Sequence, residues 1–346
     1  MTDSLNNPRK QPKQPAKSLN TPAFFNVALS TWRAVNASYT RAGRDTALPD
    51  GIVKLSIKAI KGARSADTLG AEREGTGVVI DASGLILTVG YLVIEAGSIL
   101  AMAPDGRVHP ATVVGFDHAS GFGLLRASPG VAKQPLRRGD ASKLQPLQTV
   151  RIAAHESAGS VTPACVSSRR RFTGWWEYMI DDAIFTAPPR GEHSGAALLG
   201  DDGSLLGIAS LWVSDTMATG VAFPGNMFIP INLLDPIIDE LIAHGRRLAP
   251  ARPWLGIYTE EVESHVVVTR TLSDGPADRS GISRGDIILG VAGHSIGTQS
   301  EFYERLWASG VAGDDVTLHV LKDKKVKHYV VYSADRTDYF RPWVVR

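Results

Sequence analysis

The chain has 346 residues, which is enough for two domains, and its formal net charge is +2. A charge so close to neutrality gives no support for nucleic acid or another polyanion as a partner. The single cysteine, Cys165, excludes an intramolecular disulfide and a cysteine-cluster metal site, and no apolar run reaches the roughly 18 residues of a membrane-spanning helix. No motif spacing indicates a metal or a cofactor, so we expect neither.

The first residues, 1–21, are polar and contain basic residues and three prolines, which is typical of a disordered arm. A secretory signal would place an apolar stretch of about 7–15 residues after its basic residues. The nearest candidate, Phe24–Val35, is interrupted by polar side chains. We therefore expect an unsecreted, cytoplasmic protein, with a periplasmic location as the alternative.

From Ile52 onward, short β-type runs alternate with glycine, aspartate and proline. Many short strands with regular turns predict an antiparallel barrel or sandwich and not a parallel sheet with crossover helices. The strands we expect are Ile52–Ile60, Gly77–Ile80, Leu85–Thr88, Thr112–Phe116, Phe122–Arg126, Thr149–Ala153 and Leu205–Leu211.

Helical spacing of apolar residues appears at two places later in the chain. It predicts a helix over Asn232–His244, which Gly245 would end. Arg246–Pro253, with two prolines, has the composition of a linker. In the strand-rich unit that follows, one helix is expected over Ser300–Ser309, with Ser300 as its cap.

Several segments, in order, resemble the HtrA-type serine proteases. Gly75–Thr88 resembles the start of their protease domain, where a glycine-framed strand, a turn and a strand ending in Leu-Thr precede the catalytic histidine by three residues. The later matches to the protease domain are Asp105–Asp117, Phe122–Leu125, His193–Leu199, Gly220–Phe223 and Ile229–Asn232, and the matches to the family's PDZ domain are Trp254–Ile257 and Gly275–Leu289.

The resemblance covers residues 50–335 and implies an all-β, two-barrel trypsin-like domain followed by a small α+β PDZ domain. Each barrel should have six strands. The boundaries we predict are an N-terminal arm at 1–46, the trypsin-like domain at 47–245, a linker at 246–253, the PDZ domain at 254–335 and a C-terminal tail at 336–346.

The catalytic triad that the resemblance implies is incomplete. A serine protease needs a nucleophilic serine, a histidine base and an orienting carboxylate. The family pattern places these at Ser194, Tyr91 and Gly121. Tyrosine, with a reference pKa near 10, is no efficient base at neutral pH, and glycine has no carboxylate.

The nucleophile loop departs from the family pattern as well. The family has glycine two residues before the serine, where this chain has Glu192, followed by His193. A carboxylate there would oppose the negative charge that develops on the oxyanion. We therefore predict a pseudoprotease that keeps the nucleophile position. The alternative is an active serine endopeptidase whose base has moved to His193 or His118.

The PDZ resemblance implies a peptide site. Backbone N–H groups of Trp254, Leu255, Gly256 and Ile257 would hold a C-terminal carboxylate, and the Ser300–Ser309 helix would form the opposite wall. The implied partners are peptide or protein C-termini with an apolar last residue, and unfolded segments. The alternative is a PDZ fold kept for packing alone. Trp175 and Trp176 either line a binding cleft or pack on the barrel.

The resemblance also implies a homo-oligomer. HtrA-type proteins commonly form trimers through an aromatic segment that precedes the protease domain. Phe24, Phe25 and Trp32 stand in a comparable place, and large aromatic side chains often dominate interfaces. We expect a trimer assembled through residues 22–37.

Overall fold

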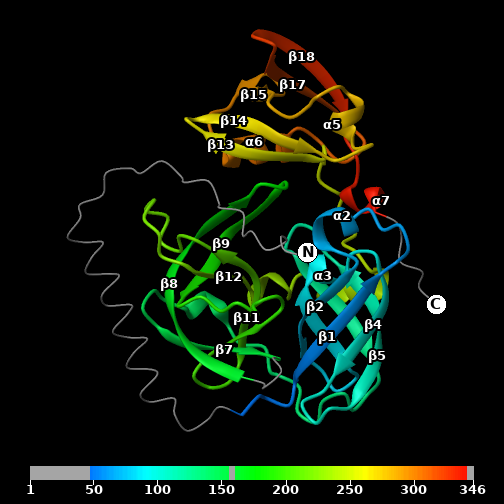
Figure 1. The fold of residues 1–346 in the computed structure, drawn as a ribbon, viewed down its shortest axis with the longest axis vertical. Helices are drawn as coiled ribbons and strands as arrows, with labels where there is room; N and C mark the ends of the chain where they lie inside the picture. Colours follow the sequence, from blue (N-terminus) through cyan, green and yellow to red (C-terminus); the bar gives the residue numbers. More distant parts are fainter. Residues whose placement is uncertain (1–46, 156–159, 341–346) are drawn as a thin grey trace, which may run out of the picture.

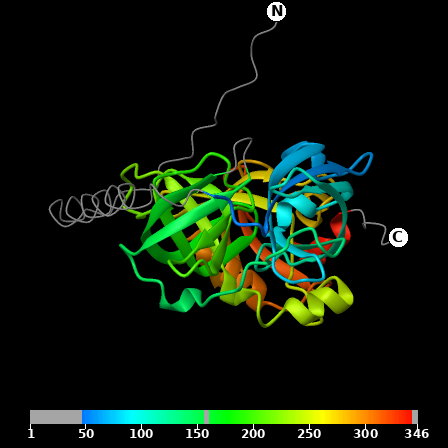
Figure 2. The ribbon, with the colours of Figure 1, turned by 90° about the horizontal axis from the view of Figure 1, so that it is seen from below.

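The computed structural model describes residues 47–155 and 160–340. Two closed barrels lie side by side, and a separate C-terminal sheet lies beyond them (Figures 1 and 2). The expected assembly segment with Phe24, Phe25 and Trp32 is outside the described residues. Within the described residues, no helix is both long and apolar enough to cross a membrane.

The first barrel closes in the order β1-β2-β3-β6-β5-β4. Two short helices, α2 (Ala66–Leu69) and α3 (Gly90–Val93), interrupt it. Its strands are β1 (Ile52–Ala59), β2 (Glu72–Val79), β3 (Leu85–Val89), β4 (Ala96–Met102), β5 (Val108–Phe116) and β6 (Phe122–Ala127).

The second barrel closes in the order β10-β11-β12-β9-β8-β7, so the prediction of two six-stranded barrels is confirmed. A 3-10 turn, η1 (Ala141–Lys143), precedes it. Its strands are β7 (Thr149–Ala154), β8 (Ser160–Gly174), β9 (Tyr178–Ala187), β10 (Ala197–Leu199), β11 (Leu205–Val213) and β12 (Gly225–Pro230). The long β8–β9 hairpin was not predicted, and it reaches from the barrel toward the C-terminal sheet (Figure 1).

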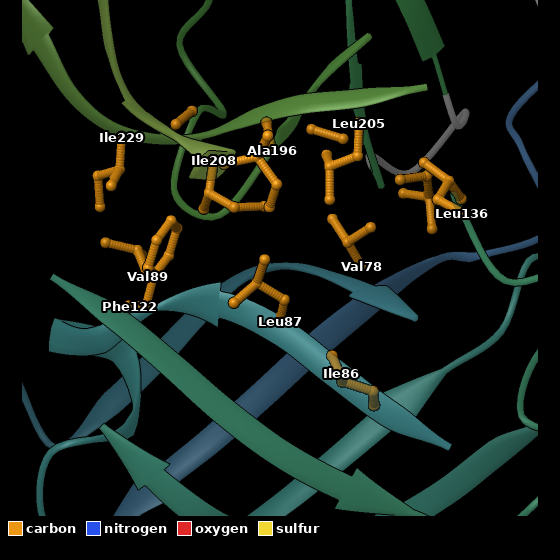
Figure 3. Packing of buried hydrophobic residues seen from close by; sticks show 14 of the residues in the cluster. Val78, Ile86, Leu87, Val89, Phe122, Leu136, Ala196, Leu205, Ile208 and Ile229 are labelled. Carbon is orange, nitrogen blue, oxygen red and sulfur yellow. The ribbon is translucent and has the colours of Figure 1, made fainter. Parts of the chain in front are cut away.

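One continuous core joins the two barrels. Figure 3 shows Val78, Leu87 and Phe122 of the first barrel facing Ile208 and Ile229 of the second. All five side chains are fully buried. Burying apolar surface contributes about 25 cal/mol for each Å², so the two barrels stabilise each other and hold the segments between them in fixed positions.

The C-terminal domain is a sheet in the order β13-β14-β15-β17-β18, with β16 paired to β15. Helices α5 (Pro276–Arg279) and α6 (Gln299–Ala308) complete it, as expected for a PDZ fold. Its strands are β13 (Ile257–Val262), β14 (His265–Thr271), β15 (Ile287–Val291), β16 (His294–Ser295), β17 (Asp315–Lys322) and β18 (Lys325–Tyr332).

Both predicted helices begin elsewhere than expected. The first is the 3-10 turn η2 (Ile231–Leu233) followed by α4 (Ile238–His244), because Pro236 has no N–H and cannot continue a regular helix. The cap of α6 is Thr298 and not Ser300. Thr298 accepts a hydrogen bond from the Glu301 N–H, and the Glu301 carboxylate accepts one from the Thr298 N–H. This capping box satisfies two helix-end donors that Ser300 would leave open.

Part of the predicted C-terminal tail is folded. Residues 336–339 form α7, whose Tyr339 ring lies 5.0 Å from Trp254 of the PDZ domain. The next residue, Phe340, stacks on His118 of the first barrel with ring centroids 5.9 Å apart. The segment after β18 therefore connects the two domains.

Candidate functional site

The nucleophile loop lies between β9 and β10, where the two barrels meet. The Thr76 N–H donates to the Ser194 carbonyl over 2.8 Å, and the Gly195 N–H donates to the Ala209 carbonyl over 2.9 Å. Gly195 has a φ of +78°, and a Cβ at this position would lie only 2.1 Å from the Thr76 carbonyl oxygen. Only glycine fits here, so the loop is locked against both β2 and β11.

Tyr91 reaches the same place from the first barrel. It lies in α3, directly after β3, and the buried Arg73 guanidinium donates to the carbonyls of Tyr91 (3.2 Å) and Ile94 (2.6 Å). The neighbouring Gly90 N–H donates to the Gly121 carbonyl over 2.7 Å. The fold thus gathers the positions that the sequence assigned to histidine, aspartate and serine.

The Tyr91 hydroxyl makes two hydrogen bonds. Its Oη lies 2.9 Å from Ser194 Oγ and 2.9 Å from the Ser210 carbonyl oxygen. In both bonds the phenol is the donor, so its single hydrogen is shared between the Ser210 carbonyl and Ser194 Oγ. A group that donates to the Ser194 hydroxyl oxygen is not placed to take its proton.

Burial keeps this phenol neutral. It raises the pKa of Tyr91 to about 12, although the hydrogen bond with Ser194 acts in the opposite direction. At neutral pH the phenol oxygen carries no charge and is a very weak base. The arrangement holds Ser194 in place and does not activate it.

A second tyrosine fills the space beside Gly121. The Tyr178 hydroxyl donates to the Ser120 carbonyl over 2.9 Å. A Cβ at Gly121 would lie 2.5 Å from Tyr178 Oη and 3.1 Å from Ile229 Cδ1, and the φ of Gly121 is +85°. A carboxylate-bearing residue therefore does not fit at this position unless Tyr178 moves.

Neither of the histidines considered as a relocated base touches the nucleophile. His193 Nδ1 donates to the Gly191 carbonyl over 2.8 Å, and burial lowers the pKa of its imidazole. His118 packs edge-on against Phe116 at 4.7 Å, and its pKa is well below 6.5 because it is buried. Both are half-buried rather than exposed loop residues. Among the described residues, Tyr91 is the side chain that bonds Ser194 Oγ.

Glu192, which the resemblance assigned to the oxyanion region, is exposed. The sequence did not single out His155, although its N–H donates to Thr76 Oγ1 over 3.2 Å and its Nδ1 is buried without a partner. Thr76 in turn bonds the Ser194 carbonyl. The position of His155 directly after a β-run was its only signal in the sequence.

The predicted carboxylate loop of the PDZ domain, Trp254–Ile257, holds a carboxylate in this structure. The N–H groups of Leu255 and Ile257 donate to the two carboxylate oxygens of Glu177 over 3.0 and 2.8 Å. Trp254 is buried at the start of the loop, and Gly256 has a φ of +75°, which turns the loop around the carboxylate. Glu177 belongs to the β8–β9 hairpin, and no feature of the sequence indicated this contact.

Comparisons with known proteins agree with this architecture. The family model described as trypsin-like peptidase domain matches residues 75–208, and the one described as PDZ domain matches residues 253–331. The serine protease Do-like HtrA of Bacillus subtilis is 28% identical over 279 residues, which are 72% of this chain and 61% of that protein. The chain therefore contains a trypsin-like peptidase domain followed by a PDZ domain, and it is similar to the HtrA-type serine proteases.

Two further similar proteins are informative. A probable periplasmic serine protease of Haemophilus influenzae, do/HhoA-like, is 29% identical over 72% of this chain and 56% of its own length. The solved structure of the HtrA-type protease AlgW with decapeptide shares the fold, with a TM-score of 0.51 and 20% identity over 85% of this chain and 97% of that one. The chain spans 56% to 61% of the length of three curated relatives.

Proposed function

We propose that this HtrA-type chain is a pseudoprotease that recognises peptides through its PDZ domain. The observation that carries the proposal is the hydrogen bond between Tyr91 and Ser194. In an active member a histidine in this place takes the serine proton. Here a neutral phenol donates a hydrogen bond to Ser194 Oγ and does not take its proton.

The surroundings of the nucleophile support the same conclusion. Gly121 supplies no carboxylate, and the Tyr178 hydroxyl lies in the space that such a side chain would need. Glu192 places a negative charge near the position of the oxyanion. Loss of the orienting carboxylate alone costs about 10⁴ in rate in trypsin-like enzymes, and members of a triad act as a unit.

Labelling by a fluorophosphonate probe tests the proposal. Such probes modify serines whose hydroxyl is activated by a base. We expect no labelling of wild type above that of Ser194→Ala, and no cleavage of unfolded casein above the same blank. Labelling that Ser194→Ala abolishes would support the alternative, an active endopeptidase with a reorganised site, and His193 and His155 would then be the bases to mutate first.

The peptide-binding part of the proposal rests on the carboxylate loop Trp254–Ile257, which already binds a carboxylate, and on the match to a PDZ domain. The expected ligand is an extended peptide with an apolar last residue and a free C-terminal carboxylate. Titration of such a peptide, beside its C-terminally amidated twin, checks this. Equal binding of the two peptides by the full chain would contradict capture of the carboxylate.

We further propose a periplasmic location, since five of the relatives carry the word periplasmic in their names, and this replaces the cytoplasmic expectation from the sequence. Fractionation of the native host with an antibody to the chain tests this location.

We keep the proposal of a trimer formed through residues 22–37. Sedimentation of the full chain against a chain that starts at Ala47 measures it, and equal mass per particle in both would contradict it.

A further inference from the structure

The peptide site of the PDZ domain is occupied by the chain itself. In PDZ domains a ligand lies along an edge strand, beside a helix, with its terminal carboxylate at the end of the strand. The corresponding elements here are β13, α6 and the carboxylate loop Trp254–Ile257. Residues 174–177, which we call the hairpin tip, contact all three.

The first contact is with the carboxylate loop. Glu177 is 6% exposed, and its two carboxylate oxygens accept from the N–H groups of Leu255 and Ile257. The Gly256 N–H also acts on this carboxylate. These successive backbone donors are the groups that would bind the carboxylate of an incoming C-terminus, so Glu177 and a ligand cannot both use them.

The second contact is with the strand. Strand β13 is an edge strand, because its only partner in the sheet is β14. On its free side the Thr259 N–H donates to the Trp175 carbonyl over 2.8 Å. This is backbone pairing of the kind by which an extended peptide is added to a sheet.

The third contact is with the helix. Tyr303 of α6 is fully buried, and its hydroxyl donates to the Gly174 carbonyl over 2.8 Å and accepts from the Glu177 N–H over 3.0 Å. Near it, Thr173 Oγ1 lies 2.8 Å from Ser300 Oγ. Tyr303 of the helix therefore binds the backbone of the hairpin tip, and Ser300 bonds the side chain of the residue that precedes the tip.

We propose that the hairpin tip is an intramolecular ligand of the PDZ domain, with Glu177 in the place of a C-terminal carboxylate. A peptide with a free C-terminus then binds by displacing Glu177, and its apparent affinity is reduced by the fraction of molecules in which the tip is docked. This proposal rests on the peptide-binding part of the proposed function and is independent of whether Ser194 is active.

The contacts of the tip suit reversible docking. They consist largely of hydrogen bonds between backbone groups and polar side chains, and the Trp175 side chain is 43% exposed. Each such hydrogen bond can be replaced by an equivalent one from a peptide. A docked segment that is covalently linked to its site has a high effective concentration, so a free peptide must be present at high concentration or must bind more strongly.

The test compares two carboxylates that join the hairpin to the PDZ domain. Glu177 lies in the carboxylate loop, and Glu304 forms an exposed ion pair with Arg171 at the rim. A fluorescent decapeptide ending in valine, with a free or an amidated C-terminus, is titrated into full-length wild type, Glu177→Ala, Glu177→Gln and Glu304→Gln. We expect Glu177→Ala to bind the free-carboxylate peptide about tenfold tighter than wild type or more, Glu177→Gln to fall between, and Glu304→Gln to match wild type.

Equal affinity of wild type and Glu177→Ala for the free peptide would overturn the proposal and leave peptide binding intact. Binding by none of the four proteins would overturn the peptide-binding function itself, and the proposal with it. Hydrogen exchange on wild type gives a second measurement that needs no variant. The free-carboxylate peptide should speed exchange at the Glu177 amide while residues 255–257 stay protected, and the amidated twin should not. No change in the hairpin tip at saturating peptide contradicts displacement.

Discussion

The cleft at Ser194 and the peptide site of the PDZ domain are both occupied by side chains of the chain itself, but in different ways. In the cleft, Tyr91 replaces the base and Tyr178 fills the space next to Gly121, and both groups are fixed within packed barrels. At the PDZ domain, Glu177 occupies a loop that still has all its backbone donors. We propose that the catalytic chemistry has been lost, whereas the groups that bind a carboxylate are all present and are covered by the hairpin.

Two consecutive residues connect these sites. Glu177 is the last residue of the turn between β8 and β9, and Tyr178 is the first residue of β9. Glu177 points into the carboxylate loop, and Tyr178 points back to Ser120 and Gly121. We propose that the same hairpin closes the cleft at Ser194 permanently and the peptide site of the PDZ domain reversibly.

The largest effect we expect comes from putting a carboxylate back at position 121. Gly121→Asp places a side chain at a φ of +85° and within 2.5 Å of Tyr178 Oη. The combination of backbone strain and overpacking should cost roughly 3 kcal/mol or more of unfolding free energy. Urea unfolding measures this cost, and Tyr178→Phe in the same chain should recover part of it by removing the hydroxyl.

Gly106 is the matched control for that experiment. Its φ is +83°, and a Cβ there would meet nothing within 4 Å. Gly106→Ala should therefore lose only the unfolding free energy that backbone strain costs, about 1 kcal/mol. If Gly121→Ala costs no more than Gly106→Ala, Tyr178 does not close the cleft in the way described here.

Removing the hydroxyl of Tyr91 should reduce the unfolding free energy by a smaller amount. Tyr91→Phe leaves the Ser210 carbonyl and the Ser194 hydroxyl without their partner, which should cost about 1–2 kcal/mol of stability. In a double-mutant cycle with Ser194→Ala, we expect a coupling of about 1 kcal/mol. Additive effects of the two substitutions would show that the hydrogen bond between them contributes nothing.

The docking of Glu177 should weaken as pH rises. Burial raises the pKa of Glu177 to about 7. Arg336 of α7 and the N–H groups of the carboxylate loop act to lower this pKa, and Tyr303 of α6 is the other titratable group next to it. The ordinary pKa of a glutamate carboxyl is 4.5. Between pH 4.5 and 7 the docked form of the hairpin therefore binds more protons than the undocked form. Docking for this reason becomes less stable as the pH rises from 4.5 to 7. A peptide carboxylate stays ionised throughout.

Apparent peptide affinity of wild type should therefore rise by about tenfold between pH 5 and 8, equivalent to about 1.4 kcal/mol. Glu177→Gln, which cannot titrate at this position, is the control and should show little change. An equal pH response in both proteins would assign the effect to other groups and leave Glu177 without a part in it.

The smallest change in unfolding free energy should come from a substitution at the rim of the interface between the β8–β9 hairpin and the PDZ domain. The ion pair between Arg171 and Glu304 is exposed, so Glu304→Gln should change the unfolding free energy by less than about 1 kcal/mol. Thermal unfolding in low and high salt checks this. A larger loss would mean that rim charges, rather than the contacts of Glu177, hold the hairpin against the PDZ domain.

The short β-runs and turn residues are local signals, and they predicted an antiparallel barrel or sandwich. The resemblance to HtrA-type proteases implied the two six-stranded barrels, the PDZ domain and the family positions of Tyr91, Gly121 and Ser194, and the fold brings these three positions together. It could not predict what Glu177 and Tyr178 do. Their partners, Leu255 and Gly121, lie far along the chain, and the segment Arg169–Tyr178 has no periodicity that indicates where its side chains point.

Casein cleavage in the presence of the free-carboxylate peptide tests most directly the proposed difference between the two sites, in which the cleft at Ser194 is inactive and the PDZ site still binds. Wild type and Ser194→Ala are compared at saturating peptide, where the PDZ site is open and the hairpin is released. The structure predicts no cleavage above the Ser194→Ala blank, because Tyr91 and Gly121 supply neither base nor carboxylate whatever the hairpin does. Cleavage that appears with the peptide and disappears in Ser194→Ala would contradict the permanent loss of catalysis.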